Sequence, residues 1–181
     1  AFGTYTYTTG NKEAVPVTPA SVYDVASLTK TTATLLAVMK LYDKGCLSLT
    51  DRVSDYLPYL QDTDKRNITV RELLFHQSGL PYTLLFYKDA LDEDSYDGTF
   101  FKERPDKLHP ARIGRQTWAN PNFRFRPGLT SKVRTAECTL QVCDSLCLNK
   151  SFKKEYLQKI ADAPLRDKRY RYSCVGFILL Q

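Results

Sequence analysis

The sequence Ser21-Val-Tyr-Asp-Val-Ala-Ser-Leu-Thr-Lys30 leads directly into Thr31-Thr-Ala-Thr-Leu-Leu-Ala-Val-Met39. Apolar residues recur along it at helical spacing, and Gly45 is placed to end the pattern, so we predict a helix over 27–44. Leu28 and Leu35 lie a heptad apart, and apolar side chains occupy much of the helix circumference. This distribution is typical of a buried helix.

Ser27 and Lys30 are candidates for a nucleophile and its partner, because residues three apart lie on one face of a helix. A serine hydroxyl needs a neighbouring base, and a lysine can be that base only in its neutral form. The ordinary pKa of lysine is near 10.4. Burial or nearby positive charge would therefore have to lower the pKa of Lys30 substantially.

The Ser-x-x-Lys pattern is weak by itself, because ten serines and fourteen lysines make about one chance match expected. Ser151 and Lys154 form a second match in a charged segment, which we interpret as a helix N-cap followed by a solvated face. The same interpretation is open for Ser27 on these four residues alone. The long apolar helix behind Ser27 is what distinguishes it.

Further elements follow from local patterns. Thr69 and Glu72 form a capping box that predicts a helix to about His76. Elsewhere we expect a strand over 1–9, a brief helix capped by Thr50-Asp51 and stopped by Pro58, loops with short helical pieces over 82–132, a strand or helix over 139–148, a helix over 152–161 and an apolar helix within 173–181.

Composition places the chain among globular proteins of about one domain, with 43% hydrophobic and 25% charged residues. Its net charge of +6 is not clustered, which does not favour nucleic-acid binding. The apolar run from Val175 to Leu180 is far short of the roughly 20 residues that span a membrane. Five cysteines cannot all pair, so mostly buried free thiols are expected, and the spacing of Cys138, Cys143 and Cys147 fits no common zinc site.

Several segments together resemble the serine β-lactamase-like superfamily, in particular its branch of class C β-lactamases, D-alanyl-D-alanine carboxypeptidases and esterases. Residues 21–39 resemble the nucleophile region, and the next two family segments are similar to Asp51-Arg-Val-Ser-Asp-Tyr-Leu-Pro58 and Ile68-Thr-Val-Arg-Glu-Leu-Leu-Phe-His-Gln-Ser-Gly-Leu-Pro81. Tyr172-Ser173-Cys174, before an apolar helix, resembles the family motif Tyr-Ser/Ala-Asn except at its third residue.

The resemblance implies an α+β, β-lactamase/transpeptidase-like fold in which an antiparallel sheet packs with a mostly helical subdomain. Residues 1–181 would form a partial hydrolase domain that contains mainly the helical subdomain and little of the sheet. The family's N-terminal helix and its C-terminal strand with Lys/His-x-Gly are not found in the sequence. We therefore expect a domain truncated at both ends and a poor catalyst, because that strand supplies one donor of the oxyanion hole.

The resemblance also implies roles for four residues. Ser27 would form an acyl-enzyme, Lys30 and Tyr172 would move the proton, and Cys174 would take the place of a substrate-binding asparagine. The acyl substrate would be a small molecule or derive from peptidoglycan: a β-lactam, a D-alanyl peptide or an ester. No metal or cofactor is needed, and relatives with such activities usually work in the bacterial envelope.

Two alternatives remain open from the sequence. A non-catalytic relative could keep the fold for binding or sensing, which the departure at Cys174 favours. A basic scaffold for nucleic acid is the other. His76 and His109 are the only histidines; the resemblance gives His76 a structural hydrogen bond, and His109 lies in loop-like sequence. Neither is assigned to catalysis.

Overall fold

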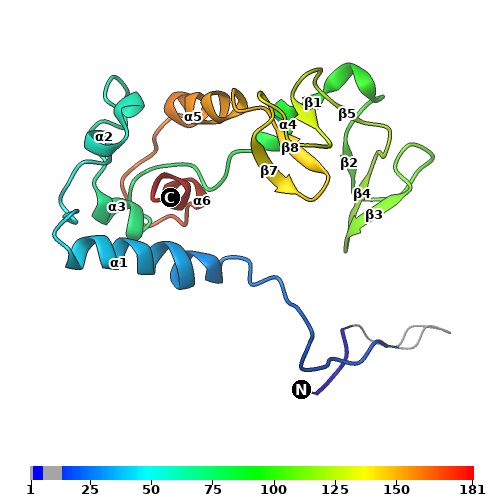
Figure 1. Cartoon of the computed structure of the whole chain (residues 1–181), viewed down its shortest axis with the longest axis horizontal. Helices are drawn as coiled ribbons and strands as arrows, with labels where there is room; N and C mark the ends of the chain where they lie inside the picture. The colour runs from blue at the N-terminus through cyan, green and yellow to red at the C-terminus, as the bar shows by residue number, and fades with distance from the viewer. Residues whose placement is uncertain (1, 6–13) are drawn as a thin grey trace.

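The helix that follows Ser27 and contains Lys30 lies along one side of the molecule (Figure 1). A computed structural model describes residues 2–5 and 14–181. The helix begins with a π-helical segment, η1 (Lys30–Thr34), and continues as α1 (Leu35–Asp43). The predicted helix is confirmed. Its first turns are more widely wound than an α-helix, a feature that is frequent at functional sites.

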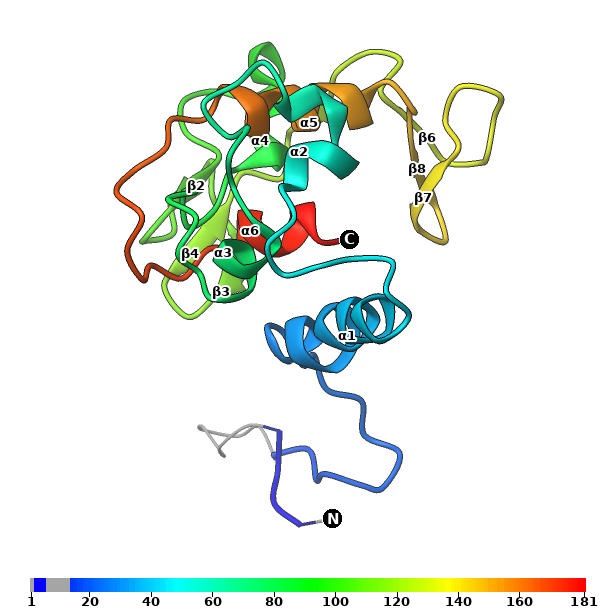
Figure 2. The same cartoon turned by 90° about the vertical axis from the view of Figure 1, so that its left-hand side faces the viewer.

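The prediction that this helix is buried is wrong for the described residues. Val38 is the one buried residue of α1, whereas Leu36 and Met39 are each 55% exposed. Figure 2 shows the reason, because α1 packs against the other helices on one side only. Apolar residues around a helix show how much of its surface could be buried. Here the described residues bury only part of the apolar surface of α1.

A helical layer covers the inner side of α1. It consists of α2 (Val53–Tyr56), η2 (Pro58–Leu60), α3 (Val70–Leu74), α5 (Phe152–Asp162) and α6 (Cys174–Leu179). In both views α6 lies between α1 and α5 (Figures 1 and 2). The fully buried residues at the centre of this layer come from distant parts of the chain and include Leu60, Ile68, Leu73, Ile160 and Val175.

The predicted helix starts have mixed outcomes. The capping box is confirmed, because Thr69 accepts a hydrogen bond from the backbone N–H of Glu72 and the Glu72 carboxylate accepts from that of Thr69. The helices predicted over 152–161 and within 173–181 are α5 and α6. The predicted cap of α2 is wrong: its N-cap is Arg52, and Asp51 instead accepts from the backbone N–H of Ser48.

The segment 82–132 departs most from expectation. It contains the expected short helices α4 (Phe86–Ala90) and η3 (Glu93–Ser95), but also strands. Antiparallel pairing joins β1 (Leu91–Asp92) to β5 (Arg124–Phe125), and orders β2 (Phe101–Lys102), β4 (Thr117–Ala119) and β3 (Ala111–Gly114) as β2-β4-β3. These strands of two to four residues are too short for a period-2 pattern to reveal.

A third small sheet follows in the chain. It pairs β6 (Thr130–Ser131), β8 (Leu146–Leu148) and β7 (Leu140–Cys143) antiparallel in the order β6-β8-β7. The segment 139–148 is therefore a hairpin, which settles its ambiguity in favour of strands. Helices and small antiparallel sheets together make the mixed α+β fold that was predicted.

Three other expectations meet the structure only in part. Of the strand predicted over 1–9, residues 1 and 6–9 lie outside the described residues, and Thr4 pairs with Pro16 in an isolated bridge. The five cysteines are free, but only Cys138 and Cys147 are buried, so the prediction of mostly buried thiols is wrong. Within the described ranges, no helix is both long and apolar enough to cross a membrane.

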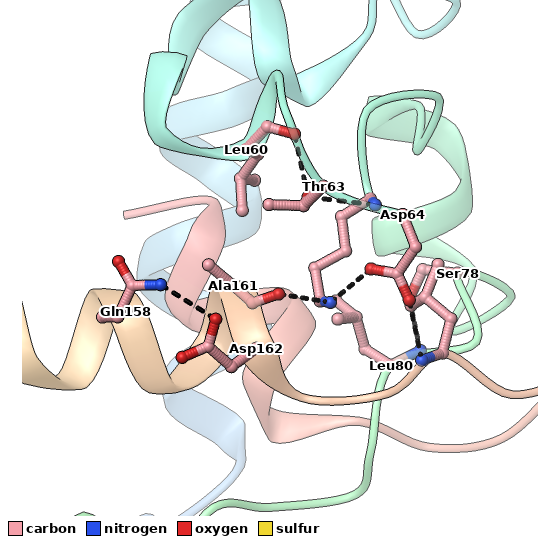
Figure 3. A network of polar contacts seen from close by, with 10 residues as sticks. Leu60, Thr63, Asp64, Ser78, Leu80, Gln158, Ala161 and Asp162 are labelled. Carbon is pink, nitrogen blue, oxygen red and sulfur yellow. Dashed lines mark hydrogen bonds and ion pairs between the residues drawn. The ribbon is translucent and has the colours of Figure 1, made fainter.

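A buried lysine connects two parts of the helical layer by hydrogen bonds. Lys65 is 1% exposed, and its Nζ donates to the carbonyl oxygen of Ala161 at 2.8 Å and to Oδ1 of Asp64 at 2.5 Å. Ala161 lies near the C-terminal end of α5 (Figure 3), where carbonyl groups lack helical partners and a positive charge is favourable. Lys65 thus fixes the loop after η2 to the end of α5.

We predict that Lys65→Met lowers the free energy of unfolding by about 1–3 kcal/mol, because it leaves the buried carbonyl of Ala161 without its donor. Urea denaturation measures the change. The matched control is Lys40→Met on the exposed side of α1, which should stay within about 0.5 kcal/mol of the parent protein. Equal stability of the two variants would contradict this role for Lys65.

Candidate active site

Ser27 is presented by a tight turn in front of the helix. Ala26 has a φ of 45°, in the left-handed region that side chains other than glycine rarely adopt and that costs on the order of 1–3 kcal/mol. Asp24 supports the turn, because its Oδ1 accepts from the backbone N–H of Ala26 at 2.7 Å. Such strain is concentrated at functional sites, and here it immediately precedes the predicted nucleophile.

The structure brings Ser27, Lys30 and Tyr172 together. Lys30 Nζ donates to Ser27 Oγ at 3.3 Å, and Tyr172 Oη donates to the same oxygen at 2.7 Å. The Lys30 ammonium also lies 5.2 Å from the centre of the Tyr172 ring. Ser27 and Tyr172 are 145 residues apart in sequence, so only the fold could join them.

The second Ser-x-x-Lys pattern has no comparable surroundings. Ser151 is the N-cap residue of α5, although its side chain makes no capping hydrogen bond. Ser151 is exposed, and so is Lys154. The contrast with Ser27 comes from Tyr172, which lies beside the first pattern.

The charge state of Lys30 differs from the expectation. The hydrogen bond with Tyr172 raises the pKa of Lys30, burial lowers it by less, and the Cys174 thiol also raises it. The lowering of the pKa that a neutral Lys30 would require is not found, because the hydrogen bond with Tyr172 outweighs the effect of burial. At neutral pH Lys30 is an ammonium group that donates to Ser27 Oγ.

The segment around Tyr172 is held by backbone contacts with residues 76–82. Arg166 donates to the carbonyl oxygen of Gly79 at 2.9 Å, and Cys174 donates to that of Tyr82 at 2.7 Å. Gly79 has a φ of +79°, and a Cβ atom there would lie 2.3 Å from the carbonyl oxygen of Arg166. Glycine is therefore required at this close approach.

The His76 ring packs against the Tyr172 ring and helps to position it. Its ring centre lies 4.5 Å from that of Tyr172 and 5.2 Å from that of Phe177. Nδ1 of His76 accepts from the backbone N–H of Ser173 at 3.2 Å, which is the structural kind of hydrogen bond that the resemblance implied. Burial lowers the pKa of His76, and the charge of Lys30 lowers it further, so the ring is neutral at neutral pH.

Cys174 lies next to this cluster. It is half-buried and begins α6, and its thiol is close enough to Lys30 to influence the lysine pKa. A substrate-binding role for Cys174 stays a prediction. His109 lies away from the cluster, where its ring nitrogens contact Asp106 Oδ1 at 2.7 Å and the carbonyl oxygen of Thr99 at 2.6 Å.

A cavity of about 430 Å³ opens beside Ser27. The cluster of Ser27, Lys30 and Tyr172 lines this cavity together with apolar residues such as Leu35 of α1, Leu74 of α3 and Phe177 of α6. The other described lining residues are Val25, Leu28, Thr31 and His76. Sequence analysis did not identify Leu74 and Phe177 as parts of the site. The capping box that places α3 and the apolar helix after Tyr172 were the signals that could have found them.

The mixed α+β fold thus places a serine, a lysine and a tyrosine together beside a cavity. A sequence model of the Beta-lactamase family matches residues 3–181, and the chain belongs to this family.

Individual relatives are similar over shorter stretches. The chain is 40% identical over 73 residues to N-acetylmuramyl-L-alanine amidase of Bacillus subtilis strain 168, covering 37% of this chain and 17% of the relative. It is 35% identical over 114 residues to Protein flp of Staphylococcus aureus strain NCTC 8325 / PS 47, covering 61% and 21%. It is 34% identical over 93 residues to a Beta-lactamase of Providencia stuartii, covering 51% and 23%. The chain thus spans about a fifth of the length of these relatives.

We predict that His76 makes stability fall in mild acid. Its pKa is lowered in the folded protein from the ordinary 6.5, so below pH 6.5 the unfolded chain binds a proton first and the free energy of unfolding decreases until the folded protein is protonated as well. Above pH 6.5 the contribution is fully present.

Urea denaturation at pH 7.5 and pH 5.5 measures this loss. The control is His76→Asn, because asparagine tolerates a φ of 55° and retains an acceptor for the N–H of Ser173. This variant should lose less stability between the two pH values than the parent protein. An equal loss would show that His76 is not the titrating group.

Proposed function

We propose that the protein is a serine hydrolase that works through an acyl-enzyme on Ser27. The observation that supports this most strongly is that Ser27 Oγ accepts two hydrogen bonds, from the Lys30 ammonium at 3.3 Å and from the Tyr172 phenol at 2.7 Å. Both donors favour negative charge on this oxygen, which is the charge that develops as a serine becomes a nucleophile.

The proton of Ser27 has one suitable acceptor in the cluster. Lys30 is already protonated, because its pKa is raised, whereas a phenol oxygen can both donate and accept. We propose that Ser27 Oγ attacks the substrate carbonyl carbon as its proton moves to Tyr172 Oη, while the phenol passes its own proton to the leaving group. Lys30 stabilises the negative charge on both oxygens during the transfer.

The remaining steps return the site to its starting state. The bond between the carbonyl carbon and the leaving group breaks as this proton arrives, and Tyr172 is left as a neutral phenol. Water then attacks the acyl carbon as one of its protons moves to Tyr172 Oη, and the phenol gives its own proton to Ser27 Oγ as that oxygen leaves the acyl carbon. The products are a carboxylic acid and an alcohol or amine.

The substrate is an acyl donor: a β-lactam, a D-alanyl peptide or an ester, small or derived from peptidoglycan. This range rests on the family match and on relatives named as an amidase and a Beta-lactamase. Work in the bacterial cell envelope is part of the same proposal.

Covalent labelling tests the nucleophile. The full-length protein is incubated with a fluorescent penicillin or a fluorophosphonate, and peptide mass spectrometry locates the adduct. We predict an adduct on Ser27 that Ser27→Ala abolishes, because alanine has no hydroxyl oxygen to form the covalent bond.

Ser151→Ala is the matched control, since it removes the serine of the other Ser-x-x-Lys pattern, and it should leave labelling unchanged. A folded protein that carries no adduct, or carries it at another residue, would favour a binding or sensing role instead.

A further inference from the structure

The cavity beside Ser27 has a mainly apolar lining. Val25 and Leu28, on either side of Ser27, line the cavity together with Leu35 of α1, Leu74 of α3 and Phe177 of α6. The aromatic rings of Tyr172 and His76 also line it. The His76 ring is neutral at neutral pH, because burial lowers its pKa. Apolar surface of this kind favours an apolar ligand group.

Lys30 is the single charged group among the described lining residues, and its ammonium is directed at Ser27 Oγ. The other described lining residues are uncharged at neutral pH. A carboxylate in the cavity would lose hydration without a matching partner.

The cavity and the nucleophile share a wall. Ser27 is itself a lining residue, and Val25 and Leu28 on either side of it line the same space. The acyl group of the substrate stays bonded to Ser27 Oγ after the leaving group departs. The acyl group is therefore the part of the substrate that lies beside the cavity. A volume of about 430 Å³ is within the roughly 300–1,000 Å³ range of small-molecule sites.

We infer that this cavity is an acyl-binding subsite, and that the preferred substrates are esters or amides of uncharged alkyl or aryl carboxylic acids. The inference rests on the proposed function and narrows its range of acyl donors. Leu35, Leu74 and Phe177 are specificity-determining residues that contact the acyl chain.

A series of 4-nitrophenyl esters tests the inference, because only the acyl group changes. The full-length protein is assayed with acetate, butyrate and hexanoate esters and with the succinate monoester, and the rate of Ser27→Ala is subtracted. We expect kcat/KM to rise about fourfold for each added methylene up to the hexanoate. The succinate, which carries a carboxylate, should react at least tenfold more slowly than the butyrate.

Two neighbouring leucines provide a matched pair of variants. Leu35 lines the cavity, whereas Leu36 is 55% exposed and is not among the lining residues described. Leu35→Trp should fill part of the cavity and lower the ratio of kcat/KM for the hexanoate to kcat/KM for the acetate at least tenfold. Leu36→Trp should leave both values unchanged, and circular dichroism checks that each variant is folded.

The outcomes separate this inference from the proposed function. If esters label Ser27 but chain length has no effect, if the succinate is preferred, or if both tryptophan variants behave alike, the acyl subsite is overturned and the nucleophile stands. If no ester or penicillin labels Ser27 in the folded protein, the proposed function itself fails.

Discussion

The hydrogen bond between Tyr172 Oη and Ser27 Oγ is the interaction on which the site depends. It joins the turn before η1 to the segment before α6, although the two residues are 145 positions apart in the sequence. Each end is fixed by its own surroundings. The strained turn at Ala26 presents Ser27, while the His76 ring and the close backbone approach at Gly79 hold the segment of Tyr172. The helical layer brings these two ends to a distance of 2.7 Å.

The charge of Lys30 decides which roles Ser27, Lys30 and Tyr172 can take in the proposed reaction. A neutral lysine would be a base for Ser27, but the hydrogen bond with Tyr172 raises the pKa of Lys30, and the opposing effect of burial does not reverse this. The phenol is then the group left to exchange a proton with the serine. A raised pKa of Lys30 is consistent with the proposal that Tyr172 relays the proton and that Lys30 acts through its charge.

Local patterns predicted the helices well, because capping residues and helical periodicity are read within a few residues: the Thr69 and Glu72 capping box is an example. Properties set by distant contacts were predicted poorly. The exposure of α1 depends on what packs against it, the short strands of 82–132 are held by pairing rather than by pattern, and the pKa of Lys30 depends on Tyr172. Tyr172 was found in the sequence by its motif, whereas Leu74 and Phe177 entered the site only through tertiary packing.

A double-mutant cycle between Lys30 and Tyr172 tests most directly whether the two residues act as a unit on Ser27. The rate of Ser27 acylation is measured for Lys30→Met, for Tyr172→Phe and for the double variant of the full-length protein. Each single change should slow acylation by about 10²–10⁴-fold, and the double variant should be little slower than the slower single variant. Losses that multiply would contradict the account, because they would mean that Lys30 and Tyr172 act on Ser27 independently.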